Sequence, residues 1–177
     1  MNNEDELQGW EAEYRTWLAR RRPLLDAAQW KDAFADYPFV EFTQTPFTAW
    51  TKNLETARLG ILTTAGYYVK DQQPRFTAKN IEGDASFRVL PDDVKASDLE
   101  IAHDHFPHAA ALADWNTVLP LDHLREMAQQ GRIKSVGPIF SISGYCTDAR
   151  ELYLKSAKKI AEAAHEAACD AVLLVPV

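Results

Sequence analysis

Three of the chain's five histidines, His103, His105 and His108, lie within six residues of one another, directly after the apolar segment 99–102. Imidazole binds divalent metals and titrates near neutral pH, so such a group can ligate a metal or transfer protons. On an extended segment the first two rings would point to the same face. Together with His108 or Asp104 they could hold a divalent metal ion. Orientation of a substrate or proton transfer is a second interpretation, and a polar loop with hydrogen-bonded histidines is a third.

Five further residues could bind a small substrate beside the histidines. Asp84, Ser86 and Arg88 alternate along a short predicted strand, so their side chains would share one face. Arg88 could hold a carboxylate through two parallel hydrogen bonds, and an internal Asp84–Arg88 pair that stiffens the strand is the alternative. Asn116 could fix an amide or carboxylate, or it could form a turn. Gly66 follows an apolar strand, where either a ligand loop or a plain turn is expected.

The elements that must position these residues alternate between strands and helices, which predicts an α/β fold with a mostly parallel, Rossmann-like sheet and flanking helices. Strands are predicted near 58–64, 86–89, 98–102, 135–142 and 171–176, and helices near 5–35, 121–130 and 147–168. We expect one domain over residues 1–177, with an N-terminal helical extension over 1–55 and a sheet core over 56–177. The segment 171–177 is apolar throughout, which is typical of a central parallel strand. His103 would follow the carboxyl end of a strand, where ligands bind in such sheets.

The composition excludes several classes of protein. A formal net charge of −7 argues against nucleic acid as the main partner, because such binders need a basic surface. No apolar run approaches the roughly 20 residues needed to span a bilayer, and the first residues are polar and acidic rather than a secretory signal. The two cysteines, Cys146 and Cys169, form no CxxC pair, and we interpret them as small, half-buried side chains. A cytoplasmic protein with reduced thiols is therefore expected.

Five segments together resemble one known protein family. They are RLGILTTAGYY from Arg58, GDASFRVLP from Gly83, IAHDHF from Ile101, DWNTVLPLDHLREMAQQGRI from Asp114 and DAVLLVPV from Asp170. No single segment is specific, but their order and spacing resemble the selenoprotein B family of the glycine, sarcosine, betaine and D-proline reductases. The resemblance covers roughly residues 55–177.

The resemblance implies an oxidoreductase that cleaves a carbon–nitrogen bond of an amino acid or related small amine. A selenocysteine or cysteine would displace the amine at the α-carbon, and a second thiol would then resolve the adduct. In the family this nucleophile follows the stretch that matches 171–177, and here nothing follows Val177. Neither Cys146 nor Cys169 matches it by position. We therefore expect no catalytic nucleophile within the chain, and no C–N cleavage by the chain as printed.

Two explanations of this ending stay open. A reading frame that stops at a selenocysteine codon would end at the residue before the nucleophile, and a lineage could also have lost the nucleophile and kept the scaffold. The alternative function is a non-catalytic metal- or ligand-binding α/β module that acts with a partner chain. In either case we expect a small-molecule ligand, and a homo-oligomer or a partner reductase subunit. We also expect Val177 to lie beside a pocket formed by Gly66, His103, His105 and Asn116, because the carboxyl ends of neighbouring parallel strands meet at one edge.

Overall fold

The computed structural model describes residues 3–43, 47–77 and 81–177. Along the chain the helices and strands are α1 (Asn3–Asp26), α2 (Trp30–Ala33), β1 (Arg58–Thr63), β2 (Tyr67–Val69), β3 (Phe87–Leu90), β4 (Leu99–Ile101), α3 (Ala109–Ala113), α4 (Leu121–Gln129), β5 (Ser135–Ile142), α5 (Ala149–Leu152), α6 (Lys158–Glu166) and β6 (Ala171–Val175). A π-helical turn, Tyr153–Ala157, joins α5 to α6, and a 3-10 helix, Trp115–Thr117, precedes α4. The predicted helix over 5–35 therefore divides at the turn after Asp26.

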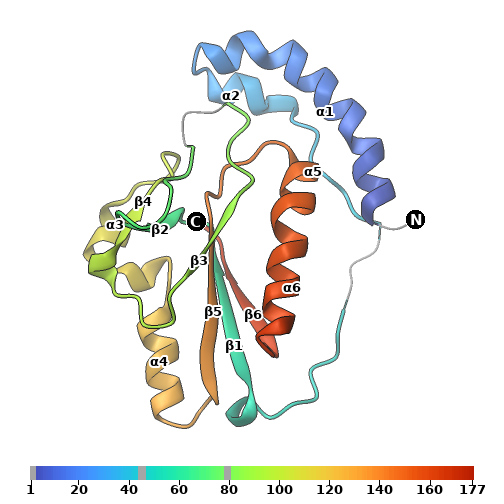
Figure 1. Ribbon diagram of the computed structural model, residues 1–177. Coiled ribbons are helices and arrows are strands. Elements are labelled where there is room, and N and C mark those ends of the chain that lie inside the picture. Colours follow the sequence, from blue (N-terminus) through green and yellow to red (C-terminus); the bar gives the residue numbers. More distant parts are fainter. Residues whose placement is uncertain (1–2, 44–46, 78–80) are drawn as a thin grey trace.

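The main sheet has the strand order β3-β5-β1-β6 (Figure 1). Strand β1 pairs in parallel with both β5 and β6, while β3 pairs with β5 in the antiparallel sense. The α/β fold with a mostly parallel sheet is thus confirmed, with an antiparallel strand at one edge. That the sheet is Rossmann-like stays a prediction.

Two strands differ from their predicted places in the sheet. The segment expected as a core strand near 98–102 forms β4, which pairs only with β2, antiparallel, in a separate two-stranded sheet. The predicted central strand near 171–176 forms β6 at the edge of the main sheet, and Leu174 is 65% exposed there. An apolar run shows that a strand suits burial, but it does not encode which strand becomes its neighbour.

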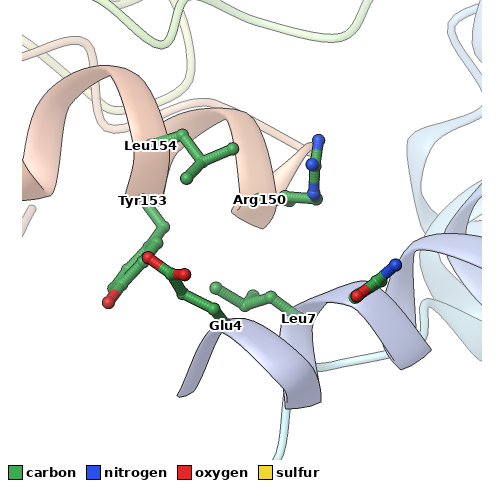
Figure 2. A pocket seen from close by; sticks show the side chains of 6 residues that line it. Glu4, Leu7, Arg150, Tyr153 and Leu154 are labelled. Atoms are coloured by element: carbon green, nitrogen blue, oxygen red, sulfur yellow. The ribbon is translucent and has the colours of Figure 1, made fainter. Parts of the chain in front are cut away.

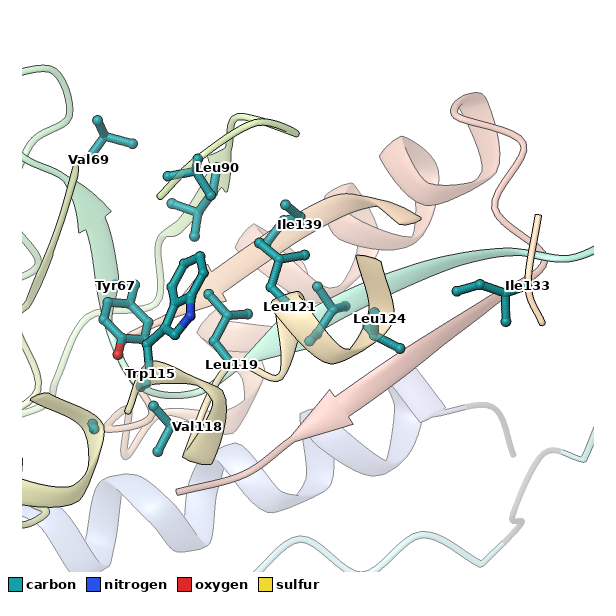
Figure 3. Packing of buried hydrophobic residues seen from close by; sticks show 14 residues of the cluster. Tyr67, Val69, Leu90, Trp115, Val118, Leu119, Leu121, Leu124, Ile133 and Ile139 are labelled. Atoms are coloured by element: carbon teal, nitrogen blue, oxygen red, sulfur yellow. The ribbon is translucent and has the colours of Figure 1, made fainter. Parts of the chain in front are cut away.

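The side chains of the parallel strands alternate between two helical layers. Ile61 and Ile139 belong to a core with Leu121 and Leu124 of α4, which Figure 3 shows in detail. The next residues along these strands, Leu62 and Phe140, instead pack with Ile160 and Ala164 of α6. This alternation follows from the pleat, which turns successive side chains to opposite faces. The sheet is therefore covered on both sides and presents its carboxyl edge to the loops.

The N-terminal helices pack against the chain near that edge (Figure 1). Three aromatic side chains of α1 stack in sequence, with ring centroids 4.9 Å apart for Trp10 and Tyr14 and 5.9 Å apart for Tyr14 and Trp17. The indole nitrogen of Trp17 donates to the carbonyl oxygen of Ala33 over 3.1 Å, which ties α1 to α2. Within the described ranges, no helix is both long enough and apolar enough to cross a membrane.

A second contact joins α1 to the segment after β5. Figure 2 shows a shallow pocket between α1 and the α5 segment, which contribute Glu4, Leu7, Gln8, Arg150, Tyr153 and Leu154. Leu7 is 2% exposed, and Arg150 pairs with Glu11 over 3.3 Å. The hydroxyl groups of Tyr14 and Tyr37 also reach Thr147, at its side-chain oxygen (2.9 Å) and its carbonyl oxygen (2.7 Å). Helix α1 and Tyr37 thus support the loop that follows β5.

Replacing Tyr14 with phenylalanine tests this support. The change removes a buried hydrogen bond to Thr147 and is expected to lower the free energy of unfolding by about 1 kcal/mol. Urea unfolding followed by tryptophan fluorescence and by far-UV circular dichroism measures the loss. If residues 1–55 and 56–177 are one domain, both probes should report a single transition. Tyr153→Phe is the control, because the Tyr153 hydroxyl makes no hydrogen bond to the described residues. Equal effects of the two changes would contradict the prediction.

Candidate functional site

Gly66 joins the carboxyl edge of the main sheet to the histidine segment. Its N–H donates to the carbonyl oxygen of Ile142 at the end of β5, and its own carbonyl oxygen accepts from the N–H of Ala102, both at 2.9 Å. Gly66 has φ +69°, and a Cβ there would lie only 3.0 Å from the Cβ of His103. A glycine suits this turn because a larger residue would be strained and would press on His103.

His103 is a buried, neutral imidazole. Its residue is 5% exposed, and its Nδ1 accepts the backbone N–H of His105 at 3.2 Å. Burial lowers the pKa of His103 to about 4, and the nearby imidazoles of His105 and His108 add to this effect. Because Nδ1 is an acceptor, the single proton of the neutral ring must be on Nε2. His103 can therefore offer a hydrogen-bond donor at Nε2 near neutral pH.

The Nε2 atom of His103 lies beside Gly144 and the end of β1. A Cβ at Gly144, which has φ +67°, would lie 2.6 Å from this Nε2 and 2.4 Å from the carbonyl oxygen of Thr64. The side-chain oxygen of Thr64 in turn accepts the N–H of Val177 at 2.9 Å. The structure thus brings Gly66, His103 and the segment after β6 to one edge of the sheet. The topological reason is that β1, β5 and β6 run in the same direction.

His105 forms an aromatic cluster with two residues that the sequence analysis did not identify. Its ring stacks on Tyr145, with centroids 4.1 Å apart, and Trp30 meets it edge-on at 5.7 Å. A small cavity opens here, lined by Thr77, Ala102, His103, Asp104, His105, Ser143 and Tyr145. Tyr145 could have been found from the Gly144-Tyr145 pair at a strand end. Nothing in the sequence signals Trp30, since α2 reaches the site only through tertiary packing.

The predicted three-histidine metal site is not formed. Among the residues that the structure describes, no group of three or more His, Cys, Asp or Glu side chains could hold a metal ion. The Nε2 of His108 lies 2.6 Å from the carbonyl oxygen of His103, so that nitrogen is already engaged. The expectation assumed an extended segment, but β4 ends at Ile101 and a turn begins at Asp104. The rings of His103 and His105 consequently lie 5.8 Å apart at an angle of 59°.

The predicted substrate residues Asp84 and Ser86, just before β3, and Arg88, within it, form a hydrogen-bonded network. The Asp84 carboxylate accepts from the N–H groups of Thr77 and Ser86, each at 2.8 Å, and Arg88 donates to the Ser86 hydroxyl at 2.9 Å. Burial raises the pKa of Asp84, but the hydrogen bonds from Ser86 and Thr77 outweigh it and leave the pKa lowered. Arg88 also donates to the carbonyl oxygen of Pro74. This arrangement matches the stiffening interpretation, with Ser86 as the link between Asp84 and Arg88.

Asn116 is not with Gly66 and His103, contrary to the expected single pocket. Its Nδ2 donates to Asp114 at 2.9 Å and to Asp122 at 3.1 Å, and its Oδ1 accepts the N–H of Asp122 at 3.0 Å. Asp114 also caps the 3-10 helix by accepting the N–H of Asn116. These bonds fix Asn116 at the start of α4. The nearest cavity, of about 410 Å³, includes Tyr67, His108, Asp114, Asn116 and Asp122 in its lining.

Comparison with known proteins identifies the family. The model of the glycine/sarcosine/betaine reductase selenoprotein B family matches residues 24–177, which is more than the resemblance alone indicated. The chain is also 33% identical over 138 residues to the D-proline reductase subunit gamma of Acetoanaerobium sticklandii. That alignment covers 77% of this chain and 55% of the relative, so the chain spans about half the length of the protein it matches. No solved structure matches. The chain therefore belongs to the glycine/sarcosine/betaine reductase selenoprotein B family.

Proposed function

We propose that this chain contributes to the reductive cleavage of a carbon–nitrogen bond in an amino acid or related small amine. The single observation that carries the proposal is the meeting of Val177, Thr64, Gly144 and His103 at the carboxyl edge of the sheet. The family resemblance implies a thiol or selenol nucleophile directly after the segment that matches 171–177. A residue in that position would begin beside Thr64, on the side where His103 lies.

His103 would support such a nucleophile as a hydrogen-bond donor. A thiolate or selenolate attacks, and a donor close to it favours the charged form over the protonated form. The neutral Nε2–H of His103 can donate to this anion, or to a substrate carboxylate, without carrying a charge of its own. His103 is a poor candidate for a general base at Nε2, because that atom carries the proton.

The proposed reaction has two steps, and in each step one bond forms while another breaks. The nucleophile forms a bond to the α-carbon as the C–N bond breaks, and the amine leaves with the electron pair and takes up a proton. A second thiol then attacks the sulfur or selenium, so that the carbon takes the electron pair and a proton. The two chalcogen atoms end as an oxidised pair, which a dithiol reductant must reduce again.

Assembly with another chain is part of the proposal. The relative from Acetoanaerobium sticklandii is named as a subunit, and β6 exposes Leu173 and Leu174 at the edge of the sheet. An unpaired edge strand offers backbone hydrogen bonds to a further strand. We propose a partner reductase subunit or a second copy of the chain there, in the cytoplasm.

An appended cysteine tests the proposed site. One cysteine is added directly after Val177, and alkylation by iodoacetamide is followed across pH, with mass spectrometry to separate it from Cys146 and Cys169. We expect the thiol pKa of the cysteine directly after Val177 to lie about one unit below that of the same cysteine placed after a Gly-Ser-Gly-Ser spacer. Its alkylation near pH 7 should be about tenfold faster than that of the spaced cysteine. His103→Asn should remove the difference. Equal thiol pKa values with and without the spacer would refute the proposed site.

A further inference from the structure

We infer that the cavity beside Tyr67 is a second binding site, for a small organic ammonium ion. The cavity lies between β4, α3 and the start of α4, and it is distinct from the small cavity that His103 and His105 line. It has a volume of about 410 Å³ and is lined by Tyr67, Ala96, Leu99, Glu100, Ile101, His108, Ala111, Leu112, Ala113, Asp114, Trp115, Asn116 and Asp122. The inference does not rest on the proposed reductase activity.

The first observation is an unsatisfied hydroxyl group. Tyr67 is 4% exposed and lines the cavity, and its hydroxyl makes no hydrogen bond to any residue in the described ranges. Figure 3 shows its ring beside Trp115, with the hydroxyl directed away from the core side chains that surround Leu90. The hydroxyl opens into the cavity, so its hydrogen-bond partner must come from solvent or from a ligand there. A ligand in the cavity would supply the missing partner.

The second observation is a carboxylate, that of Asp114, without a cationic partner among the described residues. Asp114 and Asp122 are joined through Asn116, and the indole nitrogen of Trp115 donates to Asp122 at 2.6 Å. Arg125 pairs with Asp122 over 3.6 Å, whereas no cation pairs with Asp114 in the part of the chain that the structure describes. The negative charge of Asp114 also contributes, after burial, to raising the pKa of Tyr67 to about 12. A cation close to the Asp114 carboxylate and the Tyr67 hydroxyl would offset the negative charge of Asp114.

The lining distinguishes an organic cation from a metal ion. Leu99, Ile101 and Ala111 provide apolar surface beside the rings of Tyr67 and Trp115, and aromatic faces attract alkylammonium groups. The described residues contain no group of three carboxylate, imidazole or thiol ligands for a metal. An anionic ligand would be repelled by Asp114, which has no cationic partner among the described residues. A primary ammonium on a short alkyl or cyclic body therefore fits best, with N–H groups toward Asp114 and the Tyr67 hydroxyl.

The test uses cyclopentylammonium chloride as the probe. In a titration followed by ¹H–¹⁵N NMR, we expect saturable shifts of the Trp115 indole N–H signal, with a dissociation constant on the order of millimolar. Cyclopentanecarboxylate, which has a similar body and the opposite charge, should produce no such shift. Magnesium chloride tests for an inorganic cation. A response to magnesium or to the carboxylate equal to that of the ammonium probe would overturn the inference.

Two conservative variants separate binding from folding. Tyr67→Phe removes only the unpaired hydroxyl, so we expect unchanged or higher stability together with about tenfold weaker binding. Asp114→Asn keeps the oxygen that caps the 3-10 helix and should weaken binding to a similar degree. Glu162→Gln, on α6 at the opposite face of the sheet, controls for the loss of one negative charge. Unaltered binding in both Tyr67→Phe and Asp114→Asn would overturn the inference, whatever the outcome of the reductase tests.

Discussion

Replacement of Gly144 by alanine is expected to lower the free energy of unfolding by about 3–4 kcal/mol. The added Cβ would lie 2.4 Å from the Thr64 carbonyl oxygen and 2.6 Å from the His103 ring, both far below van der Waals contact. The Thr64 oxygen belongs to the backbone, so rotation of a side chain cannot relieve the overlap. Urea denaturation measures the loss, and the imidazole signals of His103 should shift in NMR spectra.

Gly131 provides a matched control for this change. Its φ of +71° is nearly the same as that of Gly144, but a Cβ there would meet no atom within 4 Å. Gly131→Ala should therefore cost only the backbone strain, about 1 kcal/mol. The difference between the two variants isolates the steric contact at the sheet edge. If both variants lose the same stability, the loss at Gly144 comes from backbone strain alone and not from contact of the new Cβ with Thr64 and His103.

The second large effect is a loss of stability in acid that depends on His103. Its pKa is about 4 in the folded protein, against 6.5 for an ordinary histidine. Between these values the unfolded chain binds a proton that the folded chain does not, so the free energy of unfolding falls as pH decreases from 6.5 to 4. The contribution is fully present above pH 6.5. The full difference between these two pKa values corresponds to about 3.4 kcal/mol, most of which is lost by pH 4.5.

His103→Asn is the variant that reveals this contribution. The asparagine oxygen can still accept the N–H of His105, but the side chain does not titrate. The stability difference between the wild-type protein and the variant should therefore shrink by about 2–3 kcal/mol between pH 7.5 and pH 4.5. Urea unfolding at several pH values measures it, with His165→Asn, an exposed position on α6, as the control for loss of an imidazole. Parallel stability curves for the wild type and His103→Asn would contradict the prediction.

The sequence by itself determined those features that depend on local patterns. Apolar runs located β1, β5 and β6 to within two residues of their observed ends, and the helix predicted near 121–130 matches α4, after which Gly131 has φ +71°. At the start of the helix predicted near 147–168, the side chain of Asp148 accepts the N–H of Glu151 and caps α5. Turns and caps are readable because one or two residues determine their backbone geometry. The family was also accessible, because the order of several short motifs carries more information than any one of them.

Only the tertiary structure decided which of these residues meet. A periodic pattern indicates which face of a strand is apolar, but it does not encode the neighbouring strand. The predicted places of β4 and β6 in the sheet were therefore wrong. The turn after Ile101 separates His103 from His105, and hydrogen bonds to Asp114 and Asp122 hold Asn116 in another cavity. Trp30 reaches His105 because α1 and α2 fold back over the sheet edge. Such contacts arise from the packing of distant segments, which no local window of sequence contains.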